Sequence, residues 1–155
     1  MTRSATSLSL ALCQLNHWTC DVTEHWNSFA RKRQDLFGCI DILACGYNSH
    51  MGRDAIVGIQ STSRTNVAHR VQKAMANPHL LVWLRSGGHF VVWGWDEPKG
   101  RGAKKTVQIR IVQLTTDLQQ LEEVVTYLMS ELPPIARKPR STPPGTAPAP
   151  AAAAT

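Results

Sequence analysis

Two short apolar segments constrain the fold more than any other feature of this 155-residue chain. Residues 37–45 and 55–62 are rich in aliphatic side chains, and each segment is shorter than a typical globular helix. Apolar runs of this length, bounded by turn residues, are typical of buried β-strands. A polar stretch with glycines, residues 46–54, joins the two segments, so we expect them to be neighbouring strands of a hairpin.

Helical periodicity flanks this hairpin on both sides. Apolar residues at helical spacing predict a first helix over residues 7–15 and a second helix from residue 67, which Asn77-Pro78 interrupts and residues 79–85 resume. Further strands are expected at residues 21–26, 89–95 and 106–114. The last expected element is an amphipathic C-terminal helix, marked by Leu118, Leu121, Val125, Leu128 and Leu132. The order α-β-β-β-α-β-β-α predicts an α/β sandwich around a mixed sheet.

The composition predicts one folded domain and a tail. Residues 1–132 have enough apolar side chains for a single core. Residues 133–155 hold seven of the nine prolines, an alanine run and three basic residues, so we expect a disordered Pro/Ala-rich basic tail.

Several classes of protein are disfavoured by what the sequence lacks. No apolar run approaches the ~18 residues of a transmembrane helix, and no signal-peptide pattern is recognisable, so we expect no membrane contact and a cytoplasmic location, the host cytoplasm if a phage encodes the chain. The four cysteines form no CxxC pair, which argues against a zinc ribbon or a redox motif and favours reduced thiols.

One carboxylate interrupts the first apolar segment. Asp41 lies between Ile40 and Ile42, where burial disfavours a charge unless it is paired, hydrogen-bonded or bound to a cation. The next segment carries Gln60 and Thr62, which share a face because side chains alternate along a strand. Across a hairpin, Asp41 and Gln60 can meet in one polar site. The alternative is that Asp41 is a structural carboxylate satisfied within the core.

This arrangement resembles the PD-(D/E)XK nuclease superfamily, and within it the small Holliday-junction-resolvase-type enzymes of archaea and phages. The resemblance covers roughly residues 7–114 and rests on the α-β-β-β-α-β order, an Asp on one strand and a polar-x-polar pair that ends the next. It implies a restriction-endonuclease-like core with a mixed sheet flanked by helices, to which the C-terminal helix is added. It also implies a Mg²⁺- or Mn²⁺-dependent DNA endonuclease or Holliday junction resolvase, in which the two acidic motif positions hold the metal and a Lys orients or activates water.

The motif residues carry over with two departures. Asp41-Ile42-Leu43 matches the Asp motif, and Gln60-Ser61-Thr62 stands where Glu-x-Lys is expected. An amide oxygen binds a hard cation more weakly than a carboxylate does, and a Thr hydroxyl supplies no positive charge. Arg64, or Arg70 or Lys73 on the following helix, is then expected to supply it. The implied catalytic residues are Asp41, Gln60, Thr62 and Lys73, and the implied metal ligands are Asp41, Gln60 and Asp35. For Asp35 the alternative is a salt bridge with the basic residues 31–33.

The chain carries a formal net charge of +6, which fits a polyanionic partner and equally fits ordinary solubilising surface charge. We expect DNA, duplex or branched, and leave open whether the protein is a homodimer. The candidate DNA contacts are Arg31, Arg33, Arg64, Arg70, Lys104 and Lys105. Two alternatives to a nuclease remain, a nuclease-like DNA-binding protein without catalysis and a structural or protein-interaction module.

Overall fold

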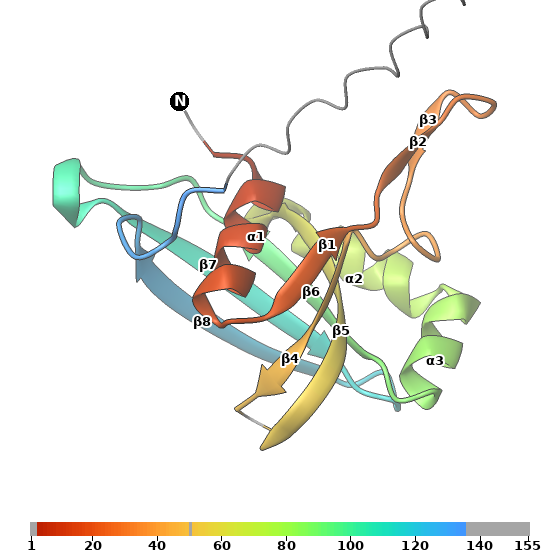
Figure 1. Cartoon of the computed structure of the whole chain (residues 1–155). Coiled ribbons are helices and arrows are strands. Elements are labelled where there is room, and N and C mark those ends of the chain that lie inside the picture. The colour runs from red at the N-terminus through yellow and green to blue at the C-terminus, as the bar shows by residue number, and fades with distance from the viewer. Residues whose placement is uncertain (1–2, 50, 136–155) are drawn as a thin grey trace, which may run out of the picture.

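The computed structural model describes residues 3–49 and 51–135 (Figure 1). Two short 3₁₀ turns, η1 (Arg64–Asn66) and η2 (Gly102–Lys104), accompany three α-helices and eight strands in this part of the chain. The helices are α1 (Ala5–Leu15), α2 (Val67–Met75) and α3 (Pro78–Arg85). The strands are β1 (Thr19–Val22), β2 (His25–Asn27), β3 (Lys32–Gln34), β4 (Ile42–Asn48), β5 (Arg53–Ser63), β6 (His89–Trp95), β7 (Thr106–Leu114) and β8 (Gln120–Leu128).

The architecture is mixed α/β, as the sequence predicts. Six strands form one mixed sheet in the order β1-β4-β5-β6-β7-β8, and β2 pairs only with β3 in a separate hairpin. Within the large sheet, β5 and β6 are parallel, and every other neighbouring pair is antiparallel. A parallel pair requires a crossover, and α2 and α3 provide it.

Helices cover both faces of the sheet, and each face has its own core (Figure 1). On the face that we call the α1 face, Leu8 and Leu12 of α1 pack against Ile42 and Ile59. On the opposite face, called the α2 face, Val67, Val71 and the α3 leucines pack with Ile40 and Phe90. Position 58 requires glycine, because a Cβ there would approach the Ile40 side chain to 2.5 Å.

The predicted elements agree with the structure over most of the chain. Strands β6 and β7 have the predicted bounds, and α1, α2 and α3 lie where helical periodicity places them. The strand predicted at residues 21–26 is divided between β1 and β2. The strand predicted at residues 37–45 begins only at Ile42, because residues 36–40 form a turn in which the Ile40 amide donates to the Leu36 carbonyl.

The predicted C-terminal helix is wrong. Residues 120–128 form β8, which pairs antiparallel with β7 along its whole length. The run Val124-Val125-Thr126-Tyr127 consists of strand-forming residues, and pairing with β7 overrides the helical spacing of the leucines. Leu118, with a φ of 59°, lies in the turn that reverses the chain, where the Thr115 amide donates to the Gln119 carbonyl.

The end of the described chain returns to the first helix. Leu132 is buried in the core of the α1 face. Arg3 donates hydrogen bonds to the carbonyls of Leu132 and Pro133 at 3.1 and 2.5 Å. The rest of the predicted tail, residues 136–155, lies outside the described residues. Among the described helices, none has both the length and the apolar character that crossing a membrane requires. All four cysteines are free thiols.

Candidate functional site

The structure brings Asp41 and Gln60 together where the start of β4 lies beside the end of β5. Asp41 directly precedes β4, and its backbone amide donates to the carbonyl of Ile59 at 2.9 Å. Its carboxylate oxygen Oδ2 accepts hydrogen bonds from Gln60 Nε2 at 2.5 Å and from the Ser61 amide at 2.9 Å. Asp41 is only 8% exposed, so these contacts form in a largely desolvated environment.

Alternation along β5 places Gln60 and Thr62 on the α2 face. Ile59 lies in the core of the α1 face, and the Ser61 hydroxyl shares a 2.7 Å hydrogen bond with Ser9 of α1. Gln60 and Thr62 therefore point to the other side of the sheet, where both are buried. Polar residues with this burial need partners, and Asp41 is the partner of Gln60.

Two further carboxyl groups lie near Asp41. Burial, followed by the negative charge of Asp35, raises the pKa of Asp41 to about 7. The Ser61 amide opposes this rise, whereas a side-chain hydrogen bond with Asp35 and the charge of Glu24 add to it. The negative charge of Asp35 is thus the largest electrostatic influence on the buried Asp41 carboxyl group.

The alternative expectation for Asp35, a salt bridge to residues 31–33, differs from the observed pairing. Arg33 pairs with Glu24 instead, at 3.2 Å between Nη1 and Oε2. Asp35 is half-buried, and its interaction with Asp41 places it beside the candidate metal ligand. Sequence spacing alone does not distinguish these two acids, because the β2–β3 hairpin between them sets which one meets Arg33.

The three proposed metal ligands offer hard oxygen donors, the kind that Mg²⁺ and Mn²⁺ prefer. A cation between Asp35 and Asp41 would relieve the repulsion that raises the pKa of Asp41. Gln60 directs its amide nitrogen at Asp41, so ligation through its oxygen requires the amide to turn over. Within residues 3–49 and 51–135, no group of three or more His, Cys, Asp and Glu side chains is arranged to hold a metal ion.

The candidate cations differ in where they lie. Lys73 is exposed on α2, and its charge acts on Cys39, a thiol that also feels Asp35 and Asp41. Burial is the main cause that raises the pKa of Cys39 to about 11. Lys73 is thus on the same side of the sheet as the carboxyl pair. Arg70 is half-buried one turn earlier on α2.

Arg64 is engaged elsewhere, in contrast to the expectation that it serves Asp41. Its Nη1 donates to Asp96, just after the end of β6, at 2.6 Å. It also donates to Gln108 on β7 at 3.1 Å. The guanidinium therefore lies over the β6–β7 pair and not over the β4–β5 pair that carries Asp41.

A projecting hairpin flanks the carboxyl pair. Strands β2 and β3 extend from the body as an arm, residues 25–34 (Figure 1). Its base is attached beside Asp41, because the Thr23 amide donates to the Asp41 carbonyl at 2.8 Å and the Thr23 hydroxyl donates to the Ile40 carbonyl at 2.7 Å. Arg31 and Arg33 are exposed on this arm.

Sequence reasoning missed the two aromatic residues of the arm. Trp26 is 62% exposed and Phe29, at the tip, is 99% exposed. Most of each ring therefore lies outside the packed core of the described chain and is accessible to a partner. The signal was present in the sequence as two aromatics just before the basic run 31–33.

The last two candidate DNA contacts lie far from the arm. Lys104 and Lys105 are exposed in the loop between β6 and β7, which contains η2. Figure 1 shows this loop and the β2–β3 arm at opposite ends of the molecule. The structure thus divides the predicted contacts into a group near Asp41 and a distant pair.

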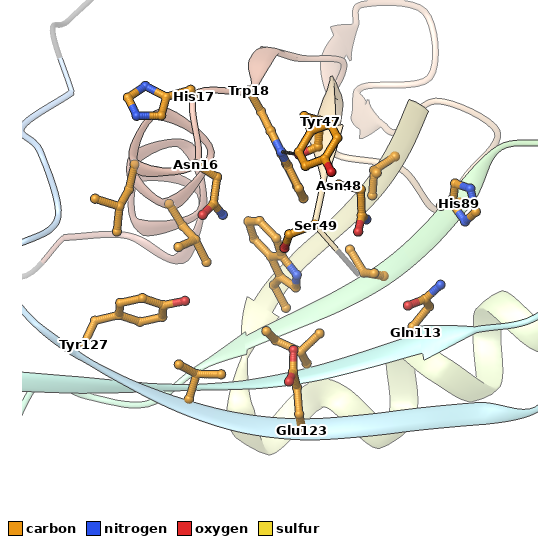
Figure 2. A pocket seen from close by; sticks show the side chains of 17 residues that line it. Asn16, His17, Trp18, Tyr47, Asn48, Ser49, His89, Gln113, Glu123 and Tyr127 are labelled. Atoms are coloured by element: carbon orange, nitrogen blue, oxygen red, sulfur yellow. Dashed lines mark hydrogen bonds between the residues drawn. The ribbon is translucent and has the colours of Figure 1, made fainter. Parts of the chain in front are cut away.

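A cavity of about 510 Å³ lies on the α1 face and does not include the Asp41–Gln60 pair (Figure 2). Its wall is formed by residues at the end of α1 and of β4, and its floor by β6, β7 and β8. Sequence reasoning gave no indication of this cavity, because a C-terminal helix was expected where β8 forms its floor.

Comparisons of the chain with protein-family models, with curated proteins and with solved structures found no match.

Proposed function

We propose that this protein is a metal-dependent DNA endonuclease that acts on branched or distorted DNA, built on a PD-(D/E)XK-like core. The observation that carries the proposal is the hydrogen bond between Asp41, directly before β4, and Gln60 on the adjacent antiparallel strand β5. Strand β5 then leads through α2 to β6, which lies parallel to it. With the β2–β3 arm treated as an insertion, the order α1-β1-β4-β5-α2-β6 supports the α-β-β-β-α-β core of that superfamily.

The polar residues divide the chemical work. Asp41, Asp35 and the Gln60 amide oxygen would hold Mg²⁺ or Mn²⁺, which when bound polarises a scissile phosphate and lowers the pKa of a water molecule. Lys73 supplies positive charge near the phosphate, and this charge stabilises the transition state. Thr62 offers a hydroxyl on the same face as Gln60, without the charge of a lysine.

The arm supplies DNA contacts beside this site. Arg31 and Arg33 neutralise phosphates, and Arg70 extends the basic surface along α2. Phe29 and Trp26 offer aromatic faces for bases that are already unstacked, as at a junction or a distorted duplex. Bases within an intact duplex lack such free faces, so this arm favours branched substrates.

A cleavage assay tests the proposal. The full-length protein is incubated with linear duplex, single-stranded and four-way-junction DNA, with Mg²⁺, with Mn²⁺ or with EDTA. We expect cleavage of the junction that requires the divalent cation, and a loss of at least about 100-fold in Asp41→Asn, since an essential metal ligand is removed.

Asp54→Asn is the matched control, because Asp54 is an exposed carboxylate at the opposite end of β5. It should cleave as the parent does. Cleavage by Asp41→Asn at the parent rate would refute the assignment of the site.

One observation favours a second candidate function, DNA binding without catalysis. Thr62 stands where a lysine is expected, and the amide nitrogen of Gln60 is bonded to the carboxylate that would bind metal. Tight, salt-dependent binding of the junction with no cleavage in either cation would support this second function. Absence of both binding and cleavage would favour a structural or protein-interaction module.

A further inference from the structure

The cavity on the α1 face has the size and the shape of a ligand site. Its volume of about 510 Å³ falls within the range of small-molecule pockets, about 300–1,000 Å³. One edge of the cavity is formed by Asn16, His17 and Trp18, and a second edge by Tyr47 and Asn48. Opposite these edges, β8 contributes Glu123 and Tyr127 (Figure 2). The lining therefore combines aromatic surface with a few polar groups.

Two stacked indoles make one side of this cavity rigid. The rings of Trp18 and Trp93 lie 6.2 Å apart between centroids, at an interplanar angle of 24°. Trp18 is held in place because its Nε1 donates to the Tyr47 carbonyl at 2.9 Å. A flat ligand can pack on aromatic surface that is already positioned, without the entropic cost of ordering it.

The indole nitrogen of Trp93 is a buried donor without an acceptor. Trp93 is 3% exposed, and no atom of the described residues accepts a hydrogen bond from its Nε1. The other interior indoles do have acceptors, since Trp95 donates to the Ser9 hydroxyl at 2.8 Å and Trp83 to the His89 carbonyl at 2.9 Å. Buried donors nearly always have a partner, and because Trp93 is one of the residues that line the cavity, a bound ligand is a source of the missing acceptor.

The charged groups of the cavity disfavour phosphate. Glu123 lines it, and neither Lys nor Arg is among its lining residues in the described chain. Burial, followed by the positive charge of Arg53, lowers the pKa of His89 and favours its neutral form. Burial, with the charges of Glu123 and Glu131, raises the pKa of Tyr127, so its hydroxyl stays protonated. A neutral ligand that carries an amino group suits these surroundings.

We propose that this cavity binds a free nucleobase or nucleoside, with the planar heterocycle packed against the Trp18–Trp93 pair, a ring acceptor on Trp93 Nε1 and an amino group on Glu123. This ligand class combines a flat aromatic ring, hydrogen-bond acceptors and an exocyclic amine within the available volume. The site is separate from Asp41 and does not depend on the proposed nuclease activity.

Tryptophan fluorescence of the full chain tests this proposal. The protein is titrated with adenosine, guanosine, cytidine and thymidine, and in parallel with AMP and a short single-stranded DNA. We expect saturable quenching by nucleosides that carry an amino group, and weaker binding of AMP and of the strand because their phosphates meet Glu123. Tighter binding of AMP or the strand than of the nucleosides would overturn the assignment to a free base.

Two variants probe the contacts. Trp93→Phe keeps an aromatic ring but removes the N–H, and it should weaken nucleoside binding about fivefold, the effect of one neutral hydrogen bond. Glu123→Gln, at an exposed position that leaves folding intact, should weaken amino-bearing nucleosides and bring AMP closer to adenosine. Trp26→Phe is the control for loss of one fluorophore, because Trp26 lies on the arm, outside the cavity. Unsaturable quenching by every nucleoside, or unchanged affinities in Glu123→Gln, would overturn the proposal.

Discussion

Asp41 is the residue whose environment departs most from that of an ordinary carboxylate. Its pKa of about 7 lies above the ordinary value of 3.8, because burial and Asp35 both disfavour the charged form. The folded state therefore holds a proton that the unfolded chain releases between these two pH values. Asp41 then contributes stability that is fully present below about pH 4 and is lost as the pH rises through about 7.

The Asp41→Asn variant mimics the neutral form and should remove this dependence. At pH 8, in EDTA, we expect Asp41→Asn to be more stable than the parent by on the order of 2–4 kcal/mol, and at pH 4 the two should be nearly equal. Urea unfolding at both pH values measures the difference, with Asp54→Asn as the control for removal of a charge. If Asp41→Asn is destabilised equally at both pH values, the carboxylate is instead a structural acceptor for Gln60 and Ser61.

For individual residues, part of the candidate site can be predicted from the sequence. A carboxylate and an amide that interrupt apolar strands are costly to bury singly, so Asp41 and Gln60 can be paired before a structure is known. The roles of Asp35 and Glu24 cannot be assigned in this way. Which acid meets Asp41 and which meets Arg33 depends on the path of the arm, and residue spacing does not encode that path.

Among the elements, a strand can be predicted when its own residues form a strand pattern. A strand whose conformation depends on pairing with a neighbour cannot be predicted in this way. Strands β6 and β7 are rich in aliphatic and aromatic residues, Gly87-Gly88 precede β6, and the predicted bounds of both strands agree with the structure. Strand β8 is exposed along much of its length, so its leucines occur at helical spacing without a strong strand pattern. The conformation of β8 is determined by the pairing of its nine residues with β7. This pairing cannot be predicted from residues 118–132 alone.

The β2–β3 arm carries the prediction at this scale. Phe29→Ala should leave the free energy of unfolding unchanged, since the side chain is 99% exposed. It should weaken junction binding by about tenfold, because stacking of one base contributes about 1–3 kcal/mol. Duplex binding should change less, because duplex bases are already stacked. Fluorescence anisotropy with both DNAs measures this, and Val82→Ala, an exposed apolar residue on α3, is the control. Equal weakening on duplex and junction would contradict a role in stacking.

For the whole molecule, the proposed DNA binding can be assigned to a surface from the distribution of charge. The net charge of +6 favours DNA binding without indicating the face, so both basic clusters are candidates from sequence. The fold separates them, since Arg31 and Arg33 lie on the arm beside Asp41, and Lys104 and Lys105 lie at the far end (Figure 1). Under the proposed function, we expect the arm, and not the distant loop, to hold the phosphate backbone beside the Asp41 site.

The salt dependence of binding to a short duplex distinguishes these two surfaces. For the parent, log K should fall linearly with log salt, by roughly 0.9 for each phosphate that is neutralised. The double variant Arg31→Ala/Arg33→Ala should reduce the slope of log K against log salt by about 2, because two phosphate contacts are removed. Lys104→Ala/Lys105→Ala removes the same charge from the distant loop and should leave the steepness unchanged. If the lysine pair instead reduces it as much as the arginine pair does, DNA must extend to the β6–β7 loop, and the arm alone would not place the substrate at Asp41.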